Sequence, residues 1–308
     1  MRRIRIGSRG SRLALVQTRS VLDAIREKLP EAVLDIQIIQ TQGDRVLDRP
    51  LAAIGDVGVF VKEIETALLE ERVDLAVHSM KDLPSTLTAD LALAATTERA
   101  DPRDVLVAKS ASSLETLPKG GKVATGSLRR RSQLLALRPD LEVEDLRGNV
   151  PTRLEKLERS DWDGILLAGA GLQRLGLADR IRAYIPVELM LPAVGQGALA
   201  LETRASDREL IEALAFLNHP ATERAVKAER SFLARLEGGC RVPIAAYAEA
   251  RGGSLRLRGY VGAVDGSRYL RREIEGDAAR AEALGIELAE SMLDAGAEVI
   301  VRHREPTP

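Results

Sequence analysis

Short strand-like runs alternate with amphipathic helices through the first two-thirds of this 308-residue chain. We expect strands at residues 3–7, 33–40, 73–77, 91–95, 105–108, 122–125, 142–145 and 164–168. Helical spacing of apolar residues marks 11–29, 60–71, 127–137 and 150–158. Strands that alternate with helices form parallel or mixed sheets with helices on both faces. The pattern therefore predicts an α/β fold for this part of the chain.

The helical patterns also predict which residues face the core. Ser11 is a suitable N-cap for the first helix. On that helix we expect five apolar residues to point inward: Leu13, Leu15, Val16, Leu22 and Ile25. On the helix over 60–71 the inner face is expected to hold Phe60, Ile64, Ala67 and Leu68.

Two segments interrupt the alternation and are candidate crossings between two α/β units. Residues 89–104 contain Asp101-Pro102-Arg103, and residues 186–197 contain two prolines and two glycines. The C-terminal part has a different pattern, with a helix at 220–235, strand-like runs at 242–249, 254–262 and 268–275, and a helix at 277–295. Strands followed by a helix predict a smaller α+β domain. A chain of this length is also expected to form two or three domains.

The composition argues against several classes of protein. The one cysteine, Cys240, allows no internal disulfide or multi-cysteine zinc site, and the three histidines are scattered along the sequence, so we expect no metal. The N-terminus reads as a strand rather than a signal peptide, and no run is apolar enough to span a bilayer. We therefore expect a cytoplasmic protein with no membrane association.

The charges give no support to a nucleic-acid partner. The formal net charge is −1 and aromatic residues make up only 3% of the chain, whereas nucleic-acid modules use basic surfaces and stacking rings. The 37 arginines far outnumber the 8 lysines. Codon bias explains the total, so the positions of the arginines are more informative than their number.

Four polar motifs follow expected strands at the points where the strands end: Gly7–Arg12, His78–Asp82, Thr125–Arg131 and Leu146–Arg153. Ligands of open α/β sheets bind beyond the carboxyl ends of the strands. Helix N-termini and arginine forks at such places bind carboxylates or phosphates. Each motif alone also fits an ordinary capped turn or a solvated basic face. Their recurrence indicates a cleft for a multiply charged acid, without a nucleotide-binding fingerprint.

Cys240 follows Gly238 and Gly239 in a turn before an expected strand. Most lone cysteines are small buried hydrophobic residues. A thiol exposed in a flexible turn is suited instead to nucleophilic attack or to a covalent tether. The sequence pattern alone leaves these alternatives open.

Nine segments together resemble the successive signature blocks of one family. They are GSRGSRLALVQ, TQGDRVLD, FVKEIETALL, DLAVHSMKDLP, ERADPRDVLV, ATGSLRRRSQL, LRGNVPTRL, LPAVGQGALALE and LEGGCRVPIAAYAE, in order from residue 4 to about 249. This set is similar to the porphobilinogen deaminases, also called hydroxymethylbilane synthases. Each block alone is modest, but nine in order are highly specific.

The resemblance implies a three-domain α/β architecture. Two domains have the type II topology of periplasmic binding proteins and are joined by a double crossover, and a small α+β domain carries the cysteine. The implied boundaries are 1–97 with 198–216, 103–191, and 219–308. A strand near 198–203 is expected to return to the first domain.

The resemblance also implies the chemistry. Family members carry a dipyrromethane cofactor bonded through a thioether to the cysteine that matches Cys240. Four molecules of the substrate porphobilinogen lose ammonia and are added in turn through azafulvenium-like cations, and water then releases hydroxymethylbilane. The family suggests a monomeric transferase of tetrapyrrole biosynthesis that needs no metal.

Residue roles follow from the matching motifs. Asp82 matches the catalytic aspartate. The residues that match the cofactor site are Cys240, Lys81, Thr125, Ser127, Arg129, Arg130, Arg147 and Gly148. Those that match the substrate site are Arg9, Ser11, Arg153, Arg174 and Gln196.

Some positions depart from the family pattern. Many bacterial members read LAKVGGKG where residues 51–58 stand here, so two lysines of a mobile loop are replaced by Ala53 and Val57. Gly126 stands where many members have Ser, and Arg12 replaces a common Pro. A non-catalytic, two-lobed carboxylate-binding protein is the alternative that the cleft and the arginines also fit.

Overall fold

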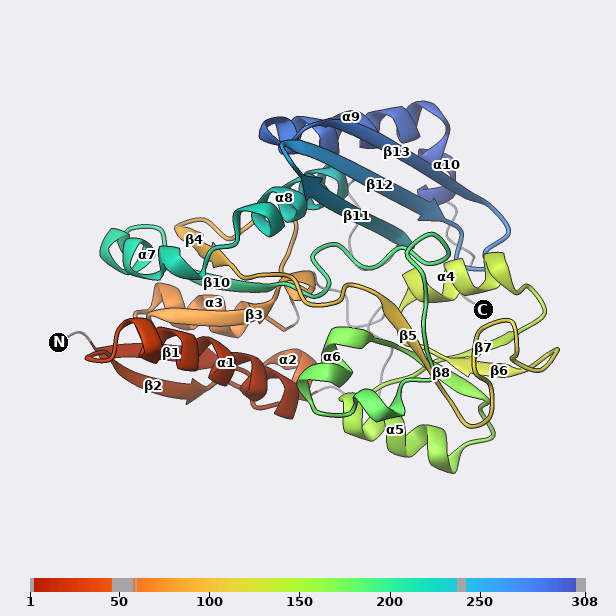
Figure 1. Cartoon of the computed structure of the whole chain (residues 1–308), viewed down its shortest axis with the longest axis horizontal. Helices are drawn as coiled ribbons and strands as arrows, with labels where there is room; N and C mark the ends of the chain where they lie inside the picture. The colour runs from red at the N-terminus through yellow and green to blue at the C-terminus, as the bar shows by residue number, and fades with distance from the viewer. Residues whose placement is uncertain (1–2, 46–57, 59, 237–241, 303–308) are drawn as a thin grey trace.

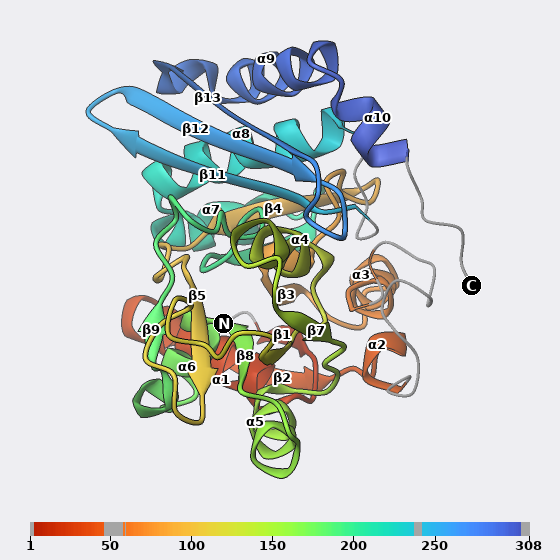
Figure 2. The same cartoon turned by 90° about the vertical axis from the view of Figure 1, so that its right-hand side faces the viewer.

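The computed structural model describes residues 3–45, 58, 60–236 and 242–302. Within these residues the chain forms two five-stranded sheets and one three-stranded sheet. Figure 1 shows the two larger sheets side by side, with the small sheet and its helices lying across one side of both. The turned view in Figure 2 shows the same layer of β11–β13 and α9 above the α/β part.

The first sheet has the order β2-β1-β3-β10-β4. Its strands are β1 (Arg3–Ser8), β2 (Val33–Ile38), β3 (Leu75–Ser79), β4 (Leu91–Thr96) and β10 (Leu199–Arg204). β1 pairs in parallel with both β2 and β3, whereas β10 runs antiparallel to both β3 and β4. The expected return of a strand near 198–203 to the first sheet is therefore confirmed.

The second sheet repeats this arrangement in the order β7-β6-β8-β5-β9. Its strands are β5 (Asp104–Ala108), β6 (Lys122–Ala124), β7 (Glu142–Glu144), β8 (Gly164–Ala168) and β9 (Ala183–Tyr184). β5 is antiparallel to β8 and β9, and it enters directly after the first crossing, as β10 enters after the second. Both sheets thus have a strand from the crossing in their fourth place. This confirms the expected type II α/β architecture with its double crossover.

The helices of the α/β part are α1 (Arg12–Lys28), α2 (Gln42–Arg45), α3 (Lys62–Leu69), α4 (Leu128–Leu137), α5 (Val150–Arg159), α6 (Gly169–Arg174) and α7 (Arg208–Leu214), with short 3₁₀ turns at Met80–Asp82 (η2), Ala178–Arg180 (η3) and Ala215–Leu217 (η4). Four of these helices, α1, α3, α4 and α5, stand close to their expected places, whereas α2, α6 and α7 were not expected. Ser11 caps α1 as expected, because its Oγ accepts a hydrogen bond from the Ala14 amide at 3.3 Å.

The expected inner face of α1 is wrong at its start. Leu22 and Ile25 are buried, but Leu13, Leu15 and Val16 are only half-buried, and the buried face instead includes Gln17, Thr18 and Val21. α1 contacts α6 of the second unit as well as β1 and β3 of its own sheet, and Leu13 in its first turn lies beside Gly171 of α6. A similar error affects Phe60, which is half-buried before the start of α3 and has the Arg9 guanidinium 4.1 Å from its ring centre.

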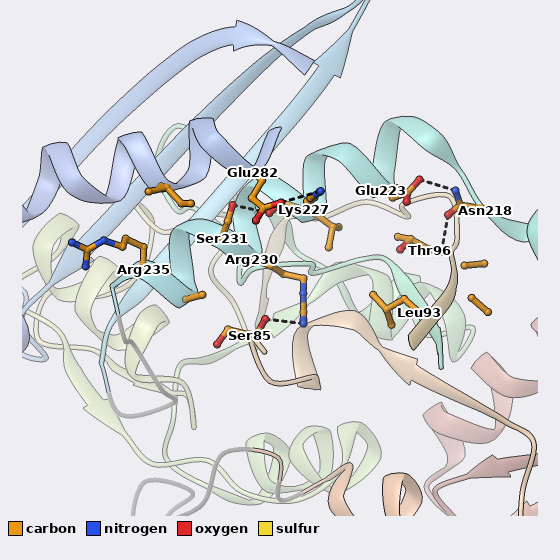
Figure 3. Close-up of a pocket in the computed structure, with 15 residues that line it drawn as sticks. Ser85, Leu93, Thr96, Asn218, Glu223, Lys227, Arg230, Ser231, Arg235 and Glu282 are labelled. Atoms are coloured by element: carbon orange, nitrogen blue, oxygen red, sulfur yellow. Dashed lines mark hydrogen bonds and ion pairs between the residues drawn. The ribbon is translucent and has the colours of Figure 1, made fainter. Parts of the chain in front are cut away.

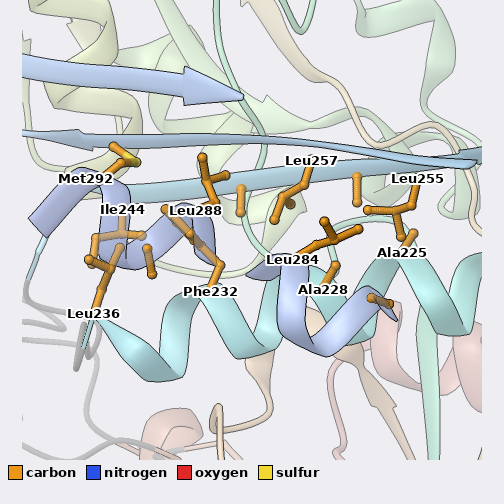
Figure 4. Close-up of a cluster of buried hydrophobic side chains, with 14 of the residues drawn as sticks. Ala225, Ala228, Phe232, Leu236, Ile244, Leu255, Leu257, Leu284, Leu288 and Met292 are labelled. Atoms are coloured by element: carbon orange, nitrogen blue, oxygen red, sulfur yellow. The ribbon is translucent and has the colours of Figure 1, made fainter. Parts of the chain in front are cut away.

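The C-terminal part is an antiparallel meander with helices on one face, which confirms the α+β prediction. It comprises α8 (Pro220–Arg235), β11 (Ile244–Arg251), β12 (Ser254–Gly262), β13 (Tyr269–Asp277), the 3₁₀ turn η5 (Ala278–Arg280), α9 (Ala281–Asp294) and α10 (Ala297–Arg302). Figure 4 shows its core between α8, α9 and the strands, with Phe232 near the centre. The limits 1–97 with 198–216, 103–191 and 219–308 stay a prediction.

Phe232 packs closely against the small sheet. The side chain is fully buried, and a Cβ added at Gly259 of β12 would lie only 2.7 Å from its ring. The glycine therefore makes room for the ring, and the ring fills the space between α8 and β12.

Phe232→Ala should lower the free energy of unfolding of this part by about 3 to 5 kcal/mol, because it removes a buried ring and leaves a cavity. Phe216→Ala is the matched control, since Phe216 is 39% exposed. Urea unfolding followed by far-ultraviolet circular dichroism measures both. Equal losses in the two variants would contradict the assignment of Phe232 as the central core residue.

Candidate active site

The expected site residues gather at the carboxyl ends of strands from both large sheets. A cavity of about 90 Å³ opens there, and Lys81 after β3, Arg130 in α4, Arg153 in α5, Arg174 in α6 and Gln196 in the second crossing all line it. Three of these residues come from the expected motifs, and the other two come from α6 and from the second crossing. The structure therefore brings five of the expected residues to one cleft between the two α/β units.

Asp104, which the sequence analysis did not single out, holds this cleft together. It is the first residue of β5 and its side chain is fully buried. Its carboxylate accepts hydrogen bonds from Arg129 at 2.6 and 3.3 Å and from Arg130 at 2.8 and 3.0 Å. Burial alone would raise the pKa of Asp104, but the two guanidinium groups outweigh it and hold that pKa below its ordinary range.

Gln196 ties the second crossing to the same carboxylate. Its Nε2 donates to Asp104 Oδ1 at 2.8 Å and to the Pro102 carbonyl at 2.7 Å. Its Oε1 accepts from Lys81 Nζ at 3.4 Å. We call Asp104, Arg129, Arg130 and Gln196 the Asp104 cluster. One buried anion thus connects α4, β5 and both crossings.

Arg129 belongs to this cluster and does not line the cavity. Besides Asp104, it donates to the Leu191 carbonyl at 2.7 Å, and its side chain is only 7% exposed. Burial lowers the pKa of Arg129, and the charge of Asp104 offsets part of that effect. Arg130 also donates to the Leu166 carbonyl at 3.1 Å, but unlike Arg129 it lines the cavity.

Three cations of the cleft make no ion pair with a carboxylate among the described residues. Arg153 donates to the Gly148 carbonyl at 2.7 Å, Arg174 donates to the Gly197 carbonyl at 2.6 Å, and Lys81 contacts only the Gln196 amide. Carbonyl and amide partners orient a cation without cancelling its charge. The cleft therefore has a surplus of positive charge.

The pKa values agree with that surplus. Burial, together with the nearby Arg130 and Arg147, lowers the pKa of Arg153 to about 10, although Asp82 acts in the opposite direction. Lys81 lines the cavity as a residue that is exposed overall. Partial loss of its water shell and the charges of the cluster arginines lower its pKa to about 8, against the opposing effect of Asp82 and Asp104. An anionic ligand beside Arg153 and Lys81 would raise both of these pKa values.

Asp82 stands beside Lys81 in the 3₁₀ turn that ends β3, and its side chain is half-buried. It acts to raise the pKa of Lys81, which follows β3 of the first unit, and that of Arg153, which lies in α5 of the second unit. A carboxylate in this place can stabilise a cation and accept or donate a proton.

The turns after β6 and β7 are shaped by hydrogen bonds and by one glycine. Ser127 caps α4 by accepting from the Arg130 amide at 3.4 Å, and Thr125 Oγ1 accepts from the Ser127 amide at 3.3 Å. A Cβ at Gly126 would lie 2.4 Å from the Leu146 carbonyl oxygen. The two turns therefore pack too closely for any side chain at residue 126 unless the backbone shifts.

The other expected residues lie outside the lining of this cavity. Arg9 is stacked on Phe60 and Ser11 caps α1, as described above. Arg147 and Gly148 lie in the turn before α5, where Gly148 adopts a φ of +110°. Cys240 lies outside the described residues, as do Ala53 and Val57.

Two residues that line the cavity, Gln17 and Ser79, were also missed. Gln17 Nε2 donates to Ser79 Oγ at 2.9 Å, and both side chains line the cavity. The sequence does indicate that Asp104 needs partners. It stands directly before the apolar run 105–108, and a charge that is buried with such a run must be paired. Gln17 stands four residues before Val21 on the helix and so shares its face.

Among the described residues, no helix is long and apolar enough to cross a membrane, and no group of histidine, cysteine and carboxylate side chains is placed to hold a metal ion.

Comparison with known proteins identifies the family. Residues 4–212 match the model of the porphobilinogen deaminase dipyrromethane cofactor-binding domain, and residues 224–294 match that of the porphobilinogen deaminase C-terminal domain. The chain belongs to the porphobilinogen deaminase family. A protein named porphobilinogen deaminase from Alkaliphilus metalliredigens is 50% identical over 301 residues, covering 98% of this chain and 95% of its own.

Two further relatives have the same name. The one from Syntrophus aciditrophicus is 50% identical, covering 98% of this chain and 99% of its own, and the one from Roseiflexus castenholzii is 52% identical, covering 96% and 97%. The resemblance therefore extends over nearly the whole length of the porphobilinogen deaminases.

Asp104→Asn should lower the stability of the second α/β unit by about 3 kcal/mol or more, because two buried guanidinium groups lose their counter-charge. Trp162, the one tryptophan of the chain, packs against a core cluster of this unit and reports its urea unfolding by fluorescence.

Asp161→Asn is the matched control. It breaks an ion pair with Lys122 in which the Asp161 side chain is 69% exposed, and such pairs contribute about 0–1 kcal/mol. If Asp104→Asn were no more destabilising than Asp161→Asn, the Asp104 cluster would not be a structural centre of the site.

Proposed function

We propose that this chain is a hydroxymethylbilane synthase in which Asp82 is the catalytic carboxylate and the cleft cations bind the acidic pyrroles. The supporting observation is the surplus positive charge beside Asp82, in a chain about 50% identical to porphobilinogen deaminases over nearly its full length. The alternative of a non-catalytic carboxylate-binding protein gains no support from these relatives.

The reaction joins four porphobilinogen molecules in sequence. In each step the carbon–nitrogen bond of the substrate's aminomethyl group breaks and ammonia leaves. A carbon–carbon bond then forms between that methylene carbon and the free α-carbon of the growing chain, which loses a proton. Water finally cleaves the bond that holds the finished four-pyrrole chain, and hydroxymethylbilane is released.

The residues of the cleft fit the dipyrromethane cofactor of the family. Its two pyrroles carry four carboxylates, and the cleft offers cations without carboxylate partners. When bound, the cofactor supplies the free α-carbon to which the first substrate is joined. In our proposal Cys240 holds it through a thioether, and its carboxylates and ring groups contact Lys81, Thr125, Ser127, Arg130, Arg147 and Gly148. We assign Arg129 to the same site, but as a positioning residue that fixes Asp104 and Arg130.

Asp82 acts on the incoming substrate. Its carboxylate stabilises the cation left when ammonia departs. It then accepts the proton that the α-carbon of the growing chain loses when the new carbon–carbon bond forms. Arg153, Arg174 and Gln196 line the cavity, and with Arg9 and Ser11 they bind the substrate's acetate and propionate. Lys81 and Arg153 hold the position of these acid groups relative to Asp82 by charge.

We infer further that the protein works as a cytoplasmic monomer without a nucleic-acid partner. A net charge of −1 supports the last point, because it provides no field that attracts a polyanion.

Asp82→Asn should reduce kcat by about 100-fold or more, because the amide neither carries charge nor accepts the proton. Binding of porphobilinogen should change little. The assay follows ammonia release and hydroxymethylbilane formation from porphobilinogen.

Asp90→Asn is the control, since Asp90 is exposed and has a φ of 64°, which asparagine adopts readily. Unchanged kcat in Asp82→Asn would remove Asp82 from the chemistry. Lack of turnover by the wild-type protein, when it is loaded with cofactor, would reject the proposed function altogether.

A further inference from the structure

A second and larger cavity lies between the first α/β unit and the C-terminal part. Its volume is about 580 Å³, within the range of small-molecule sites, and none of its lining residues lines the cleft described above. Strand β4, helix α8, helix α9 and the segment at Ser85 form its walls. The proposed synthase reaction does not use this cavity.

The cavity has an apolar wall. Leu93, Ala94 and Ala95 of β4 line one side, and Val226 of α8 and Ile286 of α9 line the other. Ile286 is 38% exposed although it is a large aliphatic side chain. An apolar group that entered the cavity would cover it from water.

Most of the charged groups around the cavity are already paired. Lys227 forms an ion pair with Glu282 at 3.0 Å, and Arg235 forms one with Glu290 at 2.7 Å. Glu223 accepts a hydrogen bond from Asn218 at 2.7 Å. Figure 3 shows the first and third of these contacts at the upper wall, and it shows Arg235 pointing away from the cavity.

Arg230 is different, because its guanidinium makes no ion pair among the described residues. Figure 3 shows it pointing to the Ser85 carbonyl, to which it donates a hydrogen bond at 3.0 Å. Burial lowers the pKa of Arg230, and the fully buried Glu202 offsets this only in part. The remaining N–H groups of this cation are the strongest donors available to a ligand here.

We propose that this cavity binds an amphipathic small molecule with a single acid group, which pairs with Arg230 while its apolar part lies along β4 and Ile286. The carboxylates of Glu223 and Glu282 on the wall disfavour ligands with several negative charges. This requirement is opposite to that of the arginine-lined cleft, so the acidic pyrroles do not belong in this cavity.

The test uses two fluorescent probes with the full-length protein. 8-Anilino-1-naphthalenesulfonate carries one anionic group on an apolar body, and N-phenyl-1-naphthylamine is its uncharged counterpart. Arg230→Gln should weaken binding of the anionic probe about tenfold and leave the uncharged probe nearly unchanged, because it removes one charge-assisted contact.

Two further variants complete the design. Ile286→Glu places a carboxylate at a partly exposed position of the apolar wall and should also weaken binding of the anionic probe. Because Ile286 lies in α9 and Arg230 in α8, this variant tests the cavity from a different helix. Arg224→Gln makes the same substitution as Arg230→Gln on the exposed face of α8, outside the cavity lining, and should have no effect.

Several results would overturn the proposal. They are equal binding of the anionic probe to all variants, no binding to the wild-type protein, and displacement of the probe by porphobilinogen, which would place it in the other cleft. If Arg230→Gln weakened binding of both probes equally, Arg230 would not recognise the acid group.

Discussion

The buried carboxylate of Asp104 is the interaction on which the cleft depends. It pairs with two arginines of α4 and accepts a hydrogen bond from Gln196, so it fixes the start of β5, the start of α4 and the second crossing at one point. None of these groups is stable in the interior without the others, since an unpaired buried charge costs several kcal/mol. The second α/β unit is therefore fixed to the second crossing at the cleft.

The same arrangement explains why the cleft can attract acids after the protein has folded. Asp104 compensates Arg129 and Arg130, but Arg153 and Arg174 are oriented by backbone carbonyls, which leave their charge available. The guanidinium groups are thus positioned before any ligand arrives, so binding costs little reorganisation. A pyrrole chain that gains two carboxylates with every unit needs several separate cations of this kind.

Much of this was predictable from the sequence, because the alternation of strands and helices determines where strands end. Motifs that follow β3, β6 and β7 had to lie on the same edge of their sheets, and Ser11 had to cap the helix that follows β1. Asp104 was missed because its partners stand 25, 26 and 92 residues away. The buried face of α1 was misjudged because its first turn packs on another unit, and the need for glycine at Gly126 depends on a contact with Leu146. A local pattern can show that a buried charge such as Asp104 needs partners, but it does not show which distant residues those partners are.

The central claim is that the cleft serves a pyrrole chain tethered at Cys240. The most direct test is denaturing intact-mass spectrometry of the protein after incubation with porphobilinogen, beside a Cys240→Ser variant. We predict that the wild-type protein has an excess mass equal to two condensed porphobilinogen units, and that the variant has none. A wild-type protein that stays unmodified under these conditions, or a variant that gains the same mass, would contradict this account.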